Sequence, residues 1–176
     1  MTSGPNVRPA CLTDVDDIVR ITNEAFMADS YFKKPEFKDR TTPGYVEEVV
    51  VRSEHETFLV YESDGRVLGS VHVSWSPSDR KGQFGMLSVS GDAQKRGIGG
   101  ALVSAVQKYC WDQLQKSSSG SVTITMPVIH SRTDLIPFYE KRGFAHCDTK
   151  PFVAPEIVQD GVLVEMLIFE KSVNFE

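Results

Sequence analysis

The chain is organised around residues 86–103, MLSVSGDAQKRGIGGALV. The apolar run from Met86 to Val89 predicts a buried strand, and a small polar turn follows it. Three glycines then open a segment whose apolar residues have helical spacing. The first four N–H groups of a helix have no partner inside it, and the helix dipole places positive potential there. Because glycines let a bulky anion approach this backbone closely, the stretch predicts a phosphate-binding turn between a strand and a helix.

Two common phosphate-binding loops fit this stretch poorly. A Walker loop requires Gly-Lys-Ser/Thr, and no Lys-Ser/Thr follows the glycines. A dinucleotide-binding fingerprint requires Gly-x-Gly-x-x-Gly, whereas Gly97-x-Gly99 is followed at once by Gly100 and position 102 is Leu. The pattern Gln94-x-x-Gly97-x-Gly99 after a Leu-x-Val strand instead resembles the pyrophosphate loop of the GNAT superfamily of acyl-CoA-dependent N-acyltransferases. The alternative is a helix that merely begins with glycines.

Composition places the chain among ordinary globular proteins, with 40% hydrophobic residues, 24% charged residues and a net charge of −5. Length predicts one domain over residues 1–176. No apolar run approaches the roughly 20 residues that cross a bilayer, and the negative charge argues against nucleic-acid binding. Cys11, Cys110 and Cys147 form no Cys-x-x-Cys pattern, so neither a metal site nor a disulfide framework is indicated. With no secretory signal at the N-terminus, we expect a cytoplasmic protein without membrane or nucleic-acid partners.

Periodicity and turn residues predict a mixed α/β order. Asp64-Gly65 between two β-rich runs is a strong hairpin signal, and Pro43 suits the first position of a helix. Ser117 to Gly120 breaks the helix after the glycines. We expect strands over 7–10, 57–62, 67–75, 82–90, 122–128, 144–150 and 162–169, and helices over about 13–26, 43–53, 98–116 and 134–143. The helical crossover between the strands near residues 89 and 122 requires a parallel pair in the sheet.

A second motif strengthens the resemblance. GNAT enzymes commonly carry Phe/Leu-Tyr-Glu-Lys-x-Gly-Phe on the helix after the fifth strand, and residues 138–144 here are FYEKRGF. The chain is therefore identified as a member of the GNAT superfamily over about residues 7–169, with a weaker likeness to arylalkylamine N-acetyltransferases in residues 135–139. The resemblance implies a central, mostly antiparallel sheet of about six or seven strands, with one splayed parallel pair and helices on both faces.

The resemblance implies transfer of the acetyl group of acetyl-CoA to a primary amine. It assigns the turn to the pyrophosphate of coenzyme A, and the side chains of Lys95 and Arg96 would add positive charge or remain solvated. The strand edge formed by Leu87, Ser88 and Val89 would hold the pantetheine arm, and the N–H of Leu87 would stabilise the thioester oxyanion. The residues assigned to the pyrophosphate by this likeness are Gln94, Lys95, Arg96, Gly97, Ile98, Gly99 and Gly100.

Tyr139, in the second motif, is the expected general acid. Its phenol is protonated at neutral pH and can donate a proton to the departing thiolate of coenzyme A. The alternative is a tyrosine that only packs in the core. Ser131 lies where many family members have an asparagine that contacts the cofactor, so a cofactor contact is expected there as well.

The general base is not assigned by the motifs. Many family members carry Glu or His on the strand before the pyrophosphate loop, but residues 83–86, QFGM, contain no ionisable group. This departure weakens the likeness to arylalkylamine enzymes, which have histidines there. Four residues remain as alternatives, together with deprotonation through ordered water: Glu24, His72, His130 and Glu165.

Substrate specificity in this fold usually comes from the segment between the first two helices and from the loop before the last strand. Phe26, Tyr31 and Phe32 are the expected substrate-binding residues, although such aromatics can also simply cap the sheet. A small-molecule amine is the leading acceptor. The alternative functions are a lysine or N-terminal protein acetyltransferase and a non-catalytic acyl-CoA sensor. The oligomeric state is expected to be a monomer or a homodimer.

Overall fold

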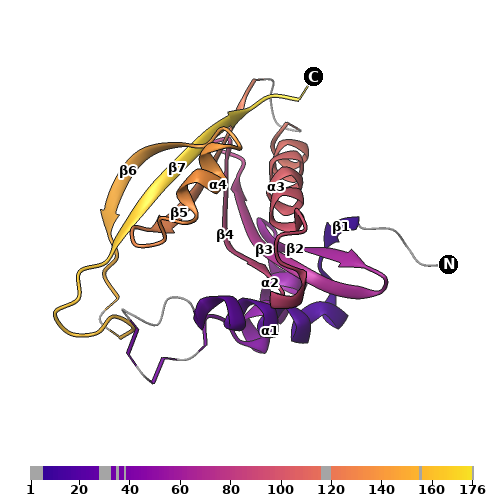
Figure 1. Ribbon diagram of the computed structural model, residues 1–176. Coiled ribbons are helices and arrows are strands. Elements are labelled where there is room, and N and C mark those ends of the chain that lie inside the picture. The colour runs from indigo at the N-terminus through magenta and orange to yellow at the C-terminus, as the bar shows by residue number, and fades with distance from the viewer. Residues whose placement is uncertain are drawn as a thin grey trace.

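The computed structural model describes residues 6–27, 33–34, 36–37, 39–115, 120–154 and 156–175. Seven strands within this part of the chain form one sheet, in the order β1-β2-β3-β4-β5-β7-β6 (Figure 1). The helices are α1 (Val15–Phe26), α2 (Pro43–Arg52), α3 (Ile98–Leu114) and α4 (Ile136–Glu140). The strands are β1 (Asn6–Pro9), β2 (Glu56–Ser63), β3 (Arg66–Ser76), β4 (Lys81–Val89), β5 (Val122–Ile129), β6 (Ala145–Pro151) and β7 (Glu165–Val173).

The expected mixed sheet with a splayed parallel pair is confirmed. β4 and β5 are parallel, and every other neighbouring pair is antiparallel. The parallel pairing runs only from Lys81 opposite Thr123 to Gln83 opposite Thr125, although β4 continues to Val89 and β5 to Ile129. The two strands therefore part beyond Gln83, and the β5-facing edge of the second half of β4 has no ladder partner in the described sheet.

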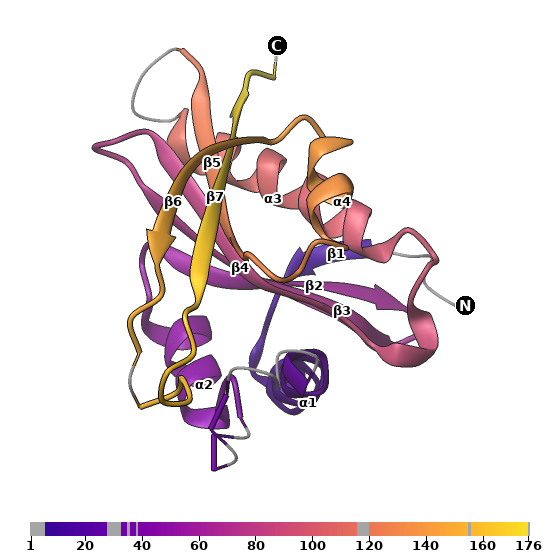
Figure 2. The same ribbon diagram turned by 60° about the vertical axis from the view of Figure 1, so that its left-hand side comes forward.

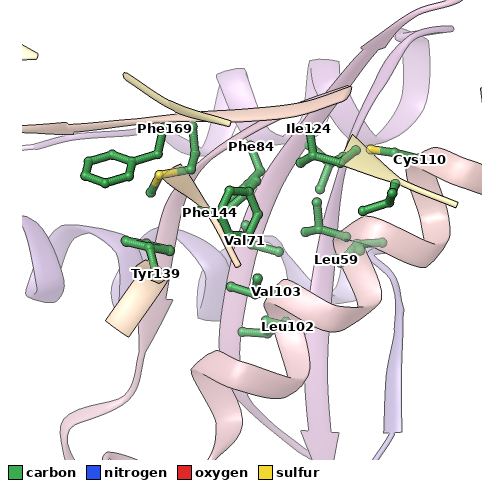
Figure 3. Close-up of a cluster of buried hydrophobic side chains, with 14 of the residues drawn as sticks. Leu59, Val71, Phe84, Leu102, Val103, Cys110, Ile124, Tyr139, Phe144 and Phe169 are labelled. Carbon is green, nitrogen blue, oxygen red and sulfur yellow. The ribbon is translucent and has the colours of Figure 1, made fainter. Parts of the chain in front are cut away.

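Helices cover both faces of the sheet, as Figure 2 shows for α1 and α2 on one side and α3 and α4 on the other. Figure 3 shows the larger core, where side chains from α3, such as Leu102 and Val103, pack against Val71 and Phe84 of the sheet. The second core lies beneath α1 and α2, and it contains Ile18 and other residues that are fully or almost fully buried. The same strands thus bury opposite faces against different helices, as period-2 alternation requires.

Local signals set several boundaries as expected. Asp64 and Gly65 both have positive φ, at 52° and 72°, which is the backbone of the predicted tight hairpin. Helix α2 begins at Pro43, and the hydroxyl oxygen of Thr42 accepts the N–H of Tyr45 at 3.4 Å. Gly143 follows α4 with φ 83°, as a helix-ending glycine does.

Three expectations need correction. The run 86–89 is not a regular buried strand: Met86 has φ 51°, the register with β3 shifts there, and Ser88 is its one buried residue. The helix expected from about residue 13 begins at Val15, because a 3-10 turn, Leu12–Asp14, precedes it and the Asp14 carboxylate accepts the N–H of Cys11 at 2.8 Å. The helix expected over 134–143 is limited to Ile136–Glu140, since turns flank it on both sides.

Candidate active site

The glycine turn places an open helix terminus after β4. Gly97 has φ 81° and caps α3, and the preceding Lys95 has φ 63°. The N–H of Ala101 bonds to the carbonyl oxygen of Gly97 at 3.0 Å, which is the first bond of the helix. The N–H groups of Ile98, Gly99 and Gly100 therefore precede the helical ladder and carry the positive end of the dipole. This geometry suits an anion.

Side chains around the turn hold its conformation. Arg96 donates from Nη2 to the carbonyl oxygen of Asp92 at 2.7 Å, and Ser90 donates to the Asp92 carboxylate at 2.6 Å. The hydrogen bond from Ser90, followed by that from Arg66, holds the pKa of Asp92 below its usual range. Lys95 and Arg96 are both exposed, so their charges face the same solvent from which an anion would approach.

Gly99 and Gly100 lie against α4 and the residues that follow it, and only Gly100 has too little room for a Cβ without a shift of its neighbour. A Cβ on Gly100 would lie 2.6 Å from Nη2 of Arg142, and a Cβ on Gly99 would lie 3.4 Å from the Phe138 ring. Arg142 stacks over the Phe138 ring at 3.7 Å and donates to the Phe138 carbonyl oxygen at 2.6 Å. The turn and the second motif are therefore neighbours in space. The sequence did not predict a role for Arg142, because nothing in the motif shows that the Arg142 side chain reaches the start of α3.

Tyr139 lies between these elements and the sheet. It is 4% exposed, and its ring packs against Phe84 of β4 at 6.1 Å, with Phe138 and Phe144 at 4.9 and 6.2 Å. Burial raises the pKa of Tyr139 well above its ordinary value of 10. The phenol therefore stays protonated throughout the neutral range.

Other predicted site residues have more varied positions. Ser131 is exposed in the turn that follows β5. Phe26 is half-buried at the end of α1, and its ring lies 3.6 Å from the ammonium of Lys33. Tyr31 and Phe32 lie outside the described residues. Leu87 and Val89 are half-buried on β4, where the ladder with β5 has already ended.

A contact between distant segments was missed by sequence reasoning. Lys33 pairs with Val158 as an isolated antiparallel bridge, and Gln159 donates to the carbonyl oxygen of Lys33 at 2.7 Å. The N–H of Lys34 donates to the carbonyl oxygen of Ile157 at 2.8 Å. Such pairing between short irregular segments has no periodic signal, so the sequence offers no means of finding it.

The candidate bases differ in their surroundings. His130 accepts the backbone N–H of Glu165 on Nδ1 at 3.0 Å, which ties this histidine and this glutamate to the β5–β7 junction. Glu24 is exposed and lies 3.5 Å from Arg20. His72 lies on β3 with its Nε2 2.9 Å from a carboxylate oxygen of Glu56. The described residues contain no group of three or more His, Cys, Asp or Glu side chains suited to a metal ion.

None of the described helices combines the length and the apolar character needed to cross a membrane.

Comparisons with known proteins agree with this geometry. The family model for the acetyltransferase (GNAT) domain matches residues 54–146, which run from β2 through the glycine turn and α4 into β6. The chain is 24% identical over 133 residues to the uncharacterized N-acetyltransferase YjcF of Bacillus subtilis (strain 168), covering 74% of this chain and 86% of that protein.

Two solved structures illustrate the shared fold. The structure of ribosomal-protein-alanine N-acetyltransferase from Brucella melitensis matches with a TM-score of 0.71 at 16% identity, covering 96% of this chain and 99% of that one. A putative phosphinothricin N-acetyltransferase matches with a TM-score of 0.72 at 16% identity, covering 98% of this chain and 100% of that one. With a family model that spans more than half of its residues, the chain belongs to the GNAT acetyltransferase family and is an acyltransferase that uses acetyl-CoA.

Proposed function

We propose that this enzyme transfers the acetyl group of acetyl-CoA to the primary amine of a small molecule, by direct attack in a ternary complex. Tyr139 is the general acid of this proposal. Acetyl transfer from a thioester needs a held acetyl donor, an unprotonated amine, a stabilised oxyanion and a proton for the leaving thiolate. The described residues offer a group for each of the first, third and fourth needs.

The acetyl donor is assigned to the turn and to β4. The open N–H groups at the start of α3 suit the pyrophosphate, and the exposed Lys95 and Arg96 add positive charge beside it. The pantetheine arm would lie along the part of β4 that β5 leaves unpaired, from Leu87 to Val89. There it can bond to main-chain groups as an added strand would, with the N–H of Leu87 directed at the thioester oxygen.

Tyr139 supports the proposal through its position and its protonation. It packs on Phe84, whose strand is the one assigned to the pantetheine, and in this proposal its phenol faces the thioester from that side. Because burial raises its pKa, the phenol keeps its proton throughout the neutral range and has a proton to donate when the departing thiolate forms beside it. Phe138 and Phe144 restrict the ring and thereby orient the hydroxyl.

The observation that favours a small acceptor is a hydrogen-bonded contact between the segment that follows α1 and the loop before β7, the two segments expected to set specificity. Figures 1 and 2 both show the loop before β7 beside the segment that follows α1. The two are bonded through Lys33, Lys34, Ile157 and Gln159, and Lys33 is only 5% exposed, with its ammonium donating to the carbonyl oxygen of Phe26 at 2.9 Å. We infer that this contact closes one side of the acceptor site, which suits a small molecule better than an extended polypeptide.

Protein acetylation is the second candidate, because one of the structural neighbours is named as a ribosomal-protein-alanine N-acetyltransferase. The two candidates differ in the acceptor alone. Release of free thiol from acetyl-CoA should therefore be measured across a panel of polyamines, arylalkylamines, amino acids, aminoglycosides, and peptides with a free N-terminal alanine or an internal lysine. Turnover of a small amine above that of every peptide supports the proposal. Turnover of peptides alone would assign the chain to protein acetylation, and tight binding of coenzyme A without any turnover would remove the catalytic role of Tyr139.

A further inference from the structure

A cross-strand row of three residues lies on the face of the sheet that α1 and α2 cover. Phe58 of β2, His72 of β3 and Gly85 of β4 are directly opposite one another in the two ladders. Phe58 is fully buried in the core beneath α1 and α2, and it fixes the face to which this row belongs. Residues opposite each other in an antiparallel ladder project to the same side, so His72 stands beside Gly85 on that face.

The preceding residue of β4, Phe84, belongs to the other face. It packs in the core beneath α3 and contacts the Tyr139 ring. Consecutive residues of a strand point to opposite sides of the sheet. Tyr139 and His72 therefore lie on opposite faces of the sheet, beside Phe84 and Gly85 respectively, just before the point where the ladder register of β4 breaks at Met86.

Space is available beside His72. A Cβ built on Gly85 would meet nothing within 4 Å, and Gly85 is only half-buried. Gly85 itself offers no side chain there, and the residue directly opposite it on β3 is His72.

His72 is held in a defined orientation. Its Nε2 is 2.9 Å from a carboxylate oxygen of Glu56, and its ring packs edge-on against Phe58 at 5.1 Å and beside Tyr45 at 6.2 Å. Its side chain is 15% exposed. A neutral imidazole that donates Nε2–H to Glu56 keeps the lone pair on Nδ1, which leaves that nitrogen able to accept a proton.

We propose that His72, oriented by Glu56, is the general base that accepts a proton from the acceptor amine. This inference rests on the proposed acetyltransferase function and adds the residue that the motifs left unassigned. His130 is a weaker choice, because its Nδ1 already accepts the N–H of Glu165. The arrangement places the base on the α1 and α2 face, next to the segment expected to bind the acceptor, and the acid on the α3 face.

The proposed transfer accounts for every proton and electron pair, with His72 acting on one face of the sheet and Tyr139 on the other. His72 takes one proton from the ammonium form of the acceptor, and the freed lone pair on nitrogen forms a bond to the thioester carbonyl carbon. The carbon–sulfur bond then breaks, the electron pair leaves with sulfur, and Tyr139 gives that sulfur its proton. The attacking nitrogen still carries two protons, and it loses one of them through solvent to reprotonate Tyr139. His72 releases its proton to solvent. The products are one amide, one free coenzyme A and one proton.

The charges around His72 set the pH range of this step. Burial lowers the pKa of His72, while the hydrogen bond and charge of Glu56 oppose that change, and the positive charge of Arg40 acts in the same direction as burial. Among the described residues, Tyr45 from α2 also lies beside the ring, and burial, with the charge of Glu56 adding to it, raises its pKa so that it stays neutral. His72 is therefore unprotonated at neutral pH and loses its function as base only when the pH falls through its lowered pKa.

The test is a pH profile of kcat/KM for the best acceptor, in the wild-type enzyme and in H72Q. An amine with a pKa near 10 has only about one free molecule in 10³ at pH 7, so loss of the base should lower kcat/KM there by about 10²-fold or more. The deficit should shrink as the pH approaches the pKa of the amine. E56Q should move the acidic limb of the profile to lower pH, because the carboxylate that raises the pKa of His72 is gone.

The controls separate folding, binding and chemistry. H146Q changes an exposed imidazole on the edge strand β6 and should retain the wild-type profile. Acetyl-CoA affinity should stay the same in H72Q and E56Q as in the wild type, and both variants should still unfold in one cooperative thermal transition. If the wild type acetylates the amine and H72Q keeps its full pH profile, His72 is not the base, whereas a wild type that acetylates no amine overturns the proposed function itself. If H72Q does not fold, E56Q still decides: an unmoved acidic limb overturns the pairing with His72.

Discussion

Replacing Tyr139 with phenylalanine removes one hydroxyl and leaves the ring contacts in place. Phe84, Phe138 and Phe144 surround the ring at 4.9–6.2 Å, and none of these contacts depends on the phenol oxygen. The free energy of unfolding should therefore change by no more than about 1 kcal/mol. Truncation to alanine, in contrast, would remove the ring from this cluster at a cost of about 3–5 kcal/mol and confuse stability with chemistry.

The effect on catalysis should be much larger than the effect on stability. A positioned general acid contributes about 10²–10⁴ in rate, so kcat should fall by that factor, equivalent to about 3–5 kcal/mol of activation free energy. The assay is steady-state release of coenzyme A thiol at saturating acetyl-CoA and acceptor. The dissociation constant of acetyl-CoA, measured by calorimetry, should change by less than about twofold, because the turn and β4 are untouched.

The pH dependence supplies an independent check. The acid must be protonated to act, and burial raises the pKa of Tyr139 above 10, so the wild-type kcat should not decline from this group below about pH 10. The variant should lose rate at every pH rather than at one end of the range. An unaltered kcat across the pH range would remove Tyr139 from the mechanism and leave it as a packing residue.

Three further predictions concern the turn, the acceptor segment and the N-terminal ion pairs. Gly97→Ala forces a side chain into a conformation with φ 81°, so it should lower the free energy of unfolding by about 1–2 kcal/mol and raise the KM for acetyl-CoA in steady-state kinetics. Lys33→Met keeps the length of the buried side chain but removes its bond to Phe26, so it should raise the KM of the acceptor and leave that of acetyl-CoA unchanged. A reversed pattern would place Lys33 outside the acceptor site. Burial acts to raise the pKa of Asp14, but hydrogen bonds from Arg8 and Cys11 outweigh it and lower that pKa, so Arg8→Ala should cost about 2 kcal/mol at pH 7 in urea unfolding. Because the depressed pKa stabilises the fold only while Asp14 is ionised, this difference should begin to shrink as the pH falls below about 4 and should disappear only below the lowered pKa of the folded-state carboxyl.

Much of the architecture could be predicted because its signals are local. Asp64-Gly65 requires a tight turn, and Pro43 at a helix start has a fixed φ, so both predictions held. The parallel pair followed from the crossover through α3, which connectivity alone demands. Short-range chemistry thus fixes elements and their order without knowledge of the tertiary contacts.

The departures arise where tertiary contacts override local patterns. The hydrophobicity of residues 86–89 suggested a buried strand, but the register break at Met86 leaves most of them half-buried beside the splayed edge. Gly100 looked like part of a phosphate loop, and the structure shows that it also gives Arg142 room. The pairing of His72 with Gly85 joins residues on different strands, so no motif within one strand could have indicated it.

The central claim, acetylation of a small amine in preference to a polypeptide, is tested most directly by comparing kcat/KM values under one set of conditions. The best small amine of the panel should exceed the best peptide with a free N-terminal alanine or lysine by at least about tenfold, with stoichiometric formation of free coenzyme A and the acetylated amine detected by mass spectrometry. A peptide acetylated with a higher kcat/KM than the best small amine would contradict the account. It would show that the β-bridge between Lys33 and Val158 does not exclude a polypeptide acceptor.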